Sequence, residues 1–125
     1  MKLHTTILAI LTLLSFTSGA FADRPIWPQQ PKISAAYESL TVALKQIEKS
    51  RAGDSAKHLA NASAALVSAR VDLDTAKKNK GSARLEAIKL IDLAKQELDA
   101  ARLDTASGYV TEAMDQVTQA AKNGR

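Results

Sequence analysis

The sequence contains no cysteine among its 125 residues. This absence excludes a disulfide framework, a lipid anchor on cysteine and the covalent attachment of a c-type haem. Histidine is almost as scarce, because the chain has two, His4 near its start and His58. A Ser-His-Asp arrangement would have to rely on His58 alone. A di-iron bundle requires Glu-x-x-His pairs on two helices, and the sequence has none.

Glycine is also rare, with five residues that stand singly or at expected helix ends, so there is no glycine-rich phosphate loop. These absences together predict that the protein is not an enzyme. Aromatic residues make up 4% of the chain, and the formal charge is only +4. A mild, dispersed charge without interleaved aromatic side chains predicts no nucleic-acid partner.

One local concentration of positive charge stands around an expected turn. It could contact lipid headgroups or nucleic acid, or it could be a solvated helix end that favours the helix dipole. The second interpretation is favoured. The cluster consists of Lys77, Lys78, Lys80 and Arg84.

The first 22 residues are typical of a secretory signal peptide. Lys2 supplies a positive start, residues 7–14 are apolar, and Ala20-Phe21-Ala22 matches a cleavage site. The apolar run is shorter than the roughly 20 residues that span a membrane. No second such run follows, so we expect no transmembrane segment after cleavage. Export without cysteine predicts a periplasmic or secreted bacterial protein.

Residues 23–33 contain all three prolines and predict an extended lead before the first helix. The lead carries Trp27, the single tryptophan of the chain. It could mark a partner or membrane contact, but we favour a side chain that folds back over a hydrophobic groove.

Residues 34–123 predict four helices, at about 34–52, 55–79, 83–102 and 105–122. Each helix starts at or directly after a residue suited to cap an N-terminus. These residues are Ser34, Asp54, Ser82 and Asp104. The second helix has a seam with steps of three and four residues: Leu59, Ala62, Leu66, Ala69, Leu73 and Ala76. The third has a wider apolar surface, with Leu90 and Leu93 beside the stripe of Leu85, Ile88, Ile91, Ala94, Leu98 and Ala101.

The helices form a repeat with a register of 51 residues. Leu40 corresponds to Ile91, and Ile47 corresponds to Leu98. Each repeat is one helical hairpin, and the connecting loops are short. The expected fold class is therefore all-α, a single up-down-up-down four-helix bundle built from two helical hairpins.

The export signal, the size and the two hairpins resemble the small metal-binding protein family, which are periplasmic four-helix bundles made of short helical repeats. The resemblance covers most of 34–123 and is closest between Ala87-Ile88-Lys89-Leu90 and Tyr109-Val110-Thr111-Glu112-Ala113. It implies binding of divalent transition metals through many histidines along the helices. Where that pattern has histidines, this chain keeps His58 but has Tyr109 and Gln116, so it resembles a histidine-depleted member.

The candidate metal ligands are His58 and Asp54, which stand four residues apart on one helical face, with Asn61 a turn later. Three such groups do not complete a tetrahedral zinc site. We therefore expect at most weak binding of copper, nickel or zinc, with water as the remaining ligands. The alternative interpretation is that His58 is a rim residue and that Asp54 only caps its helix.

Carboxylates near the helix ends could gather into a site for a hard cation. Asp72 and Asp74 point about 200° apart on a helix, and no loop has calcium-binding spacing. Solvated surface pairs, such as Asp99 with Lys95 and Arg102, are the favoured interpretation. The other carboxylates considered are Glu97 and Asp104.

Two functions from different classes follow from the sequence. The first is weak binding of a divalent transition metal in the periplasm. The second is a metal-independent interaction module, chaperone-like or stress-related, that acts through an apolar helix face. The wide apolar surface of 83–102 suggests this second function, with a homo-oligomer or a periplasmic protein as partner.

Overall fold

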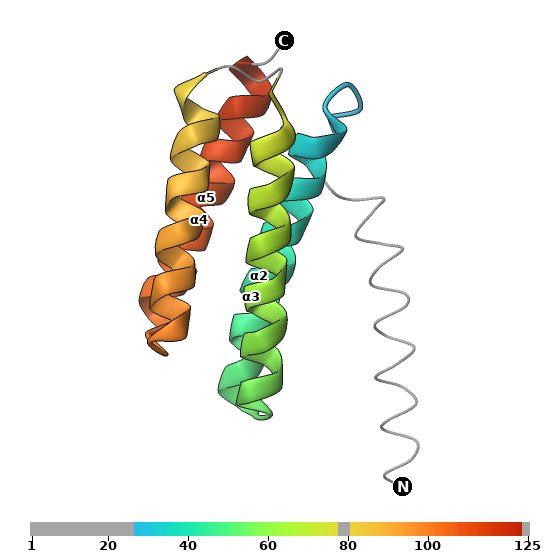
Figure 1. Cartoon of the computed structure of the whole chain (residues 1–125). Helices are drawn as coiled ribbons and strands as arrows, with labels where there is room; N and C mark the ends of the chain where they lie inside the picture. Colours follow the sequence, from blue (N-terminus) through green and yellow to red (C-terminus); the bar gives the residue numbers. More distant parts are fainter. Residues whose placement is uncertain (1–26, 78–80, 124–125) are drawn as a thin grey trace, which may run out of the picture.

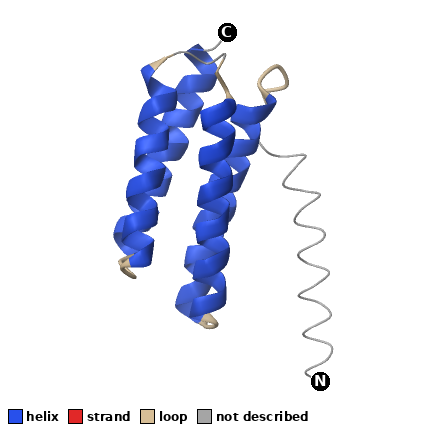
Figure 2. Ribbon diagram, viewed as in Figure 1, coloured by secondary structure: helices blue, strands red, loops and turns tan. Residues whose placement is uncertain are grey.

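The computed structural model describes residues 27–77 and 81–123. These residues form four α-helices and no strand (Figure 2). The helices are α2 (Pro31–Ala52), α3 (Ser55–Thr75), α4 (Ser82–Asp99) and α5 (Leu103–Asn123). The expected signal peptide, residues 1–22, lies outside the described residues. None of the described helices is both long and apolar enough to cross a membrane.

Consecutive helices run antiparallel and form the two expected hairpins, α2 with α3 and α4 with α5 (Figure 1). Each hairpin packs extensively within itself, and the hairpins join through α2 against α5 and α3 against α4. Within the described residues, the backbones of the diagonal pairs, α2 with α4 and α3 with α5, do not approach each other closely. The all-α four-helix bundle expected from the sequence is confirmed.

The core consists of small and large apolar side chains, which alternate along α2 and α3. In α3 the expected seam is buried from Ala62 to Ala76, and Leu59 packs against it while partly exposed. Alanine at every second seam position lets the neighbouring backbones approach closely. In the cores of α2 and α5, Leu40, Ile47 and Val117 are fully buried.

The seam of α4 differs from the expected stripe. Leu85 was expected inside but is 58% exposed. It stands two residues before the fully buried Ala87, a rotation of about 200°, which turns it away from the core. Ile91, Ala94 and Leu98 of the expected stripe are buried, together with Ala83, Ala87 and Leu90.

The expected start of the first helix at Ser34 is wrong, because α2 begins at Pro31. Proline suits the first helical position, where its missing N–H would have no partner. The extended lead thus ends before the predicted boundary of residue 33. The Ser34 hydroxyl caps nothing in α2, but accepts from the Trp27 backbone N–H at 2.9 Å and donates to the Trp27 carbonyl at 3.2 Å.

These bonds hold Trp27 in a turn against the bundle. Its indole lies edge-on to the ring of Tyr37, with 5.7 Å between the ring centroids, and packs against the core. The expected folding back of the lone tryptophan is confirmed.

Two more N-terminal caps are corrected by the structure. Ser82 and Asp104 both lie inside their helices, since α4 begins at Ser82 and α5 begins at Leu103. Asp104 is engaged by an arginine of α2, described below. The Asp104 carboxylate, which was expected to cap its own helix, is therefore bound by a side chain of another helix.

Two helices end earlier than expected, at Thr75 instead of 79 and at Asp99 instead of 102. At the end of α3, the Leu73 carbonyl accepts from the Ala76 N–H and from Arg84 Nη1, at 3.2 and 2.8 Å. These bonds replace the next helical hydrogen bond and stop the helix. The end of α4 is a Schellman turn around Ala101, whose φ is +61°.

Candidate functional site

Asp54 lies at the N-terminus of α3, in the left-handed region with φ +48° and ψ +44°. Its side chain makes no capping hydrogen bond, so the expected side-chain cap is wrong. Its backbone carbonyl instead accepts from the His58 N–H at 3.1 Å, as the first turn of the helix. The exposed carboxylate is left in solvent.

His58 faces α2 and is partly buried. Its Nδ1 lies 2.8 Å from Oε1 of Gln46, and Asn61 Nδ2 donates to the same oxygen at 3.4 Å. Because an amide oxygen only accepts, His58 Nδ1 is the donor to Gln46 Oε1, and Nε2 takes no part in this hydrogen bond. The sequence identified His58 and Asn61 on one face but gave no signal for Gln46, which comes from another helix.

The two candidate metal ligands are not in ion-pair contact with each other. No group of three or more His, Asp or Glu side chains gathers at a distance suited to a metal ion within 27–77 and 81–123. The arrangement near His58 therefore offers one imidazole nitrogen rather than a preformed cage. Metal binding at His58 and Asp54 stays a prediction.

Three of the carboxylates considered, Glu97, Asp99 and Asp104, form surface ion pairs. Asp99 pairs with Lys95 at 3.8 Å, as expected, but Arg102 pairs with Glu97 at 2.6 Å and not with Asp99. The Schellman turn brings Arg102 back over Glu97, and this hydrogen bond holds the pKa of the Glu97 carboxyl below its usual value.

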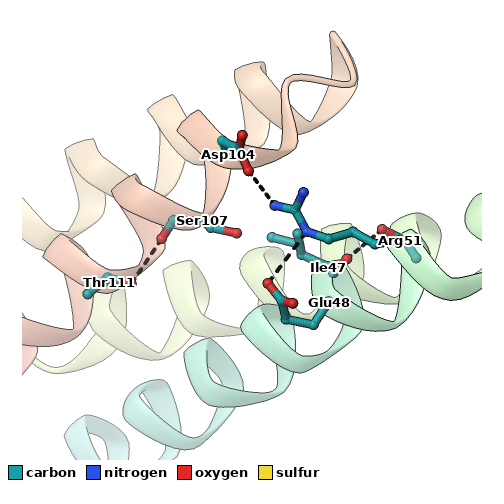
Figure 3. Close-up of polar contacts among 7 residues, drawn as sticks. Ile47, Glu48, Arg51, Asp104, Ser107 and Thr111 are labelled. Carbon is teal, nitrogen blue, oxygen red and sulfur yellow. Dashed lines mark hydrogen bonds and ion pairs between the residues drawn. The ribbon is translucent and has the colours of Figure 1, made fainter.

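Arg51 and Asp104 connect the two hairpins at the end of the bundle that carries the α2–α3 loop. Arg51 Nη2 lies 2.7 Å from Asp104 Oδ1, and its Nε lies 3.5 Å from Glu48 Oε2 (Figure 3). Beside this pair, the buried hydroxyl of Ser107 has no hydrogen-bond partner. An exposed pair such as Arg51–Asp104 contributes at most about 1 kcal/mol, so it positions α5 against α2 more than it stabilises the fold.

The basic cluster is partly explained by helix termination. Lys78 and Lys80 lie outside the described residues, and Lys77 is exposed. Arg84 donates to the Leu73 carbonyl near the end of α3. Its charge thus complements a helix C-terminus, as the favoured interpretation of the cluster expected.

The most unusual surface of the molecule is the side of α3 opposite the core. Val67 is 46% exposed and Val71 is 55% exposed, one and five residues after the fully buried Leu66. These steps rotate the two valines by about 100° and 140° from Leu66. Ala60 and Ala64 continue the same exposed stripe toward the start of the helix. We call Ala60, Ala64, Val67 and Val71 the outer face of α3.

Charge is absent from the whole middle of this helix. Between Lys57 and Arg70, α3 has no Asp, Glu, Lys or Arg. Arg70 turns toward α4, where its Nε lies 2.8 Å from Asp92 Oδ1, and this contact raises the pKa of the guanidinium. The outer face is therefore uncharged as well as exposed.

Leu85 of α4 is exposed on the side of α4 that lies next to α3. It stands two turns before Asp92, so the two side chains share one side of α4. Asp92 contacts Arg70 of α3, which places that side of α4 next to α3. The sequence suggested a wide apolar surface on α4, but of these exposed side chains only Leu85 is on α4, whereas Val67 and Val71 are on α3.

Comparison with known proteins gave no matching family model, no matching curated protein and no matching solved structure.

Proposed function

We propose that the protein is a metal-independent interaction module of the periplasm, and that it binds a protein partner through the outer face of α3, extended by Leu85. The observation that carries this proposal is the exposure of Val67 and Val71 on a helix whose middle has no charge. A helix face that only meets solvent usually carries charged or polar side chains.

The energy available from this surface is sufficient for a specific contact. Burying a whole Val or Leu side chain contributes about 1.5–3 kcal/mol. Val67, Val71 and Leu85 are each about half exposed. Covering what remains exposed would therefore contribute roughly 2–4 kcal/mol in total, before the cost of association.

The test is a capture experiment with a matched control. The protein carrying Val67→Ser and Val71→Ser is compared with the unchanged protein and with Val42→Ser, as bait in extract of the source cell envelope. Val42 is 40% exposed but lies on α2. We expect a partner bound by the unchanged protein and by Val42→Ser, and lost with the double variant. Equal capture by all three proteins contradicts the proposal.

A second candidate function, weak metal binding at His58, is favoured by one specific observation. Gln46 bonds to Nδ1 and leaves Nε2 outside this contact, which is how a second group commonly orients a ligating imidazole. Calorimetric titration with copper, nickel and zinc tests it. Weak binding should disappear in His58→Ala and weaken in Asp54→Ala. Heat that is unchanged in His58→Ala contradicts this candidate.

A further inference from the structure

We infer that the partner of the outer face is a second copy of this chain, with the two α3 helices packed antiparallel about a two-fold axis near residues 65 and 66. This inference rests on the proposed function, because it names the occupant of the same surface. It is carried by the pattern of side chains along the exposed side of α3.

The outer face belongs to a longer seam with the spacing of a coiled coil. Its exposed positions are separated by steps of three, four, three, four and three residues, which keeps them in one line along the helix. The charged residues stand only at its two ends. The seam consists of Lys57, Ala60, Ala64, Val67, Val71 and Asp74, all exposed.

An antiparallel pairing places small residues against large ones. With the axis between residues 65 and 66, Ala60 faces Val71 of the second copy and Ala64 faces its Val67. A two-fold axis repeats each contact, so both ends of the seam are filled in the same way. Alanine opposite valine allows the helix axes to approach to about 8 Å.

The same register pairs opposite charges at both ends of the seam. Lys57 faces Asp74 of the second copy, and Asp74 faces its Lys57. Neither residue forms an ion pair within the described part of one chain. A parallel pairing would put Lys57 against Lys57 and Asp74 against Asp74, so like charges oppose it.

The inferred dimer is weak and reversible. The seam has two valines per copy at its centre, and alanine adds little buried area. A contact of one helix from each chain is also smaller than a standard interface. Losing both valines, as in Val67→Ser with Val71→Ser, should weaken dimerisation at least tenfold, whereas Val42→Ser should leave it unchanged.

Charge reversal tests the register in sedimentation equilibrium. Lys57→Glu alone should weaken the dimer, because Glu then faces Asp74. Lys57→Glu combined with Asp74→Lys in the same chain should restore it, because the pair is re-formed with its signs exchanged. The double variant should not restore dimerisation if Lys57 and Asp74 affect only the fold of a single chain.

The absence of cysteine gives a second test by disulfide formation. In the antiparallel register, residue 57 faces residue 74 of the second copy. The two copies of residue 57 are therefore offset by 17 residues, or about 26 Å along the helix axis. Oxidation should cross-link a mixture of the Lys57→Cys and Asp74→Cys proteins, but neither protein alone. Val42→Cys controls for random collision.

The outcomes separate this inference from the function on which it rests. A cross-link confined to the mixture, with rescue by double reversal, supports the antiparallel dimer. Cross-links within single variants, or a monomer at every concentration, overturn it. A monomer that still captures a different protein through Val67 and Val71 overturns the dimer alone, whereas a monomer without such capture overturns both.

Discussion

The turn between α4 and α5 has an alanine where a glycine would be favoured. Ala101 has φ +61°, and the turn around it is closed by two backbone bonds. The Ala101 N–H donates to Leu98 at 2.9 Å, and the Arg102 N–H donates to Glu97 at 2.8 Å. This position of a Schellman motif is usually glycine, because a Cβ is crowded in the left-handed region. We therefore predict that Ala101→Gly stabilises the protein.

The magnitude follows from two opposing terms. A left-handed conformation costs a residue with a Cβ roughly 1–2 kcal/mol, which glycine avoids. Glycine also makes the unfolded chain more flexible, which costs about 0.4–1 kcal/mol. Ala101 is exposed, so removing its methyl group leaves no cavity. The net gain should be about 0.5–1 kcal/mol, or roughly 2–8 °C in Tm for a domain of this size.

Urea unfolding followed by circular dichroism measures this gain, with Ala100→Gly as the matched control. Ala100 precedes Ala101 and has φ −89°, where glycine relieves no strain. The control should lose up to about 1 kcal/mol. If Ala101→Gly were destabilised as much as the control, the left-handed turn would not carry the strain assigned to it.

Three further predictions concern other single positions. Gly53 has φ +148° and ψ 171°, a region nearly restricted to glycine, so Gly53→Ala should lose about 1–3 kcal/mol in urea unfolding although its Cβ would meet no atom. Ser107→Ala removes a buried hydroxyl without a partner and should gain up to about 1 kcal/mol in the same assay, and a clear loss would show that the hydroxyl is satisfied. Burial raises the pKa of Asp72 while Lys32 lowers it by less, so the charged carboxylate disfavours the folded state above the pKa of the unfolded chain. Asp72→Asn should therefore stabilise the folded protein at pH 7. The gain should disappear below about pH 3, where Asp72 is protonated in both the folded and the unfolded chain. An equal gain at the two pH values contradicts burial of the charged carboxylate as the cause.

The fold was predictable because the repeat and the core seams rest on strong periodic patterns. The seam of α3 has a leucine or alanine at every expected position and was identified nearly residue by residue. In α4 the pattern was ambiguous, since apolar residues lie on more than one side of the helix. Sequence spacing alone could not tell the inward Ala87 from the outward Leu85.

Helix ends were predicted less well because distant partners decide them. Asp104 has the local signature of an N-cap, but Arg51 from the other hairpin binds its carboxylate. Arg84 helps to end α3 through a carbonyl eleven residues earlier in the chain. Ala101 gave no signal at all, since the expected residue for its conformation is glycine.

The candidate sites were predictable only in part, for the same reason. His58 was identified because imidazole is rare in this chain, whereas Gln46 could be recognised only from the packing of α2 against α3. The exposed seam of α3 had a readable spacing in the sequence. Spacing alone does not distinguish it, because the inner seam of the same helix has the same spacing and larger side chains.

The inner and the exposed seam of α3 together indicate two different contacts of this helix. The inner seam alone would hold α3 in the bundle, and charged residues on the opposite side would favour solubility at little cost. Instead, α3 has exposed valines in its centre and places Lys57 and Asp74 at opposite ends. A surface for non-specific apolar contact would not require opposite charges at equal distances from the centre of the seam, between residues 65 and 66. That arrangement is self-complementary only when the helix meets its own copy in reverse, which favours a defined pairing over non-specific contact.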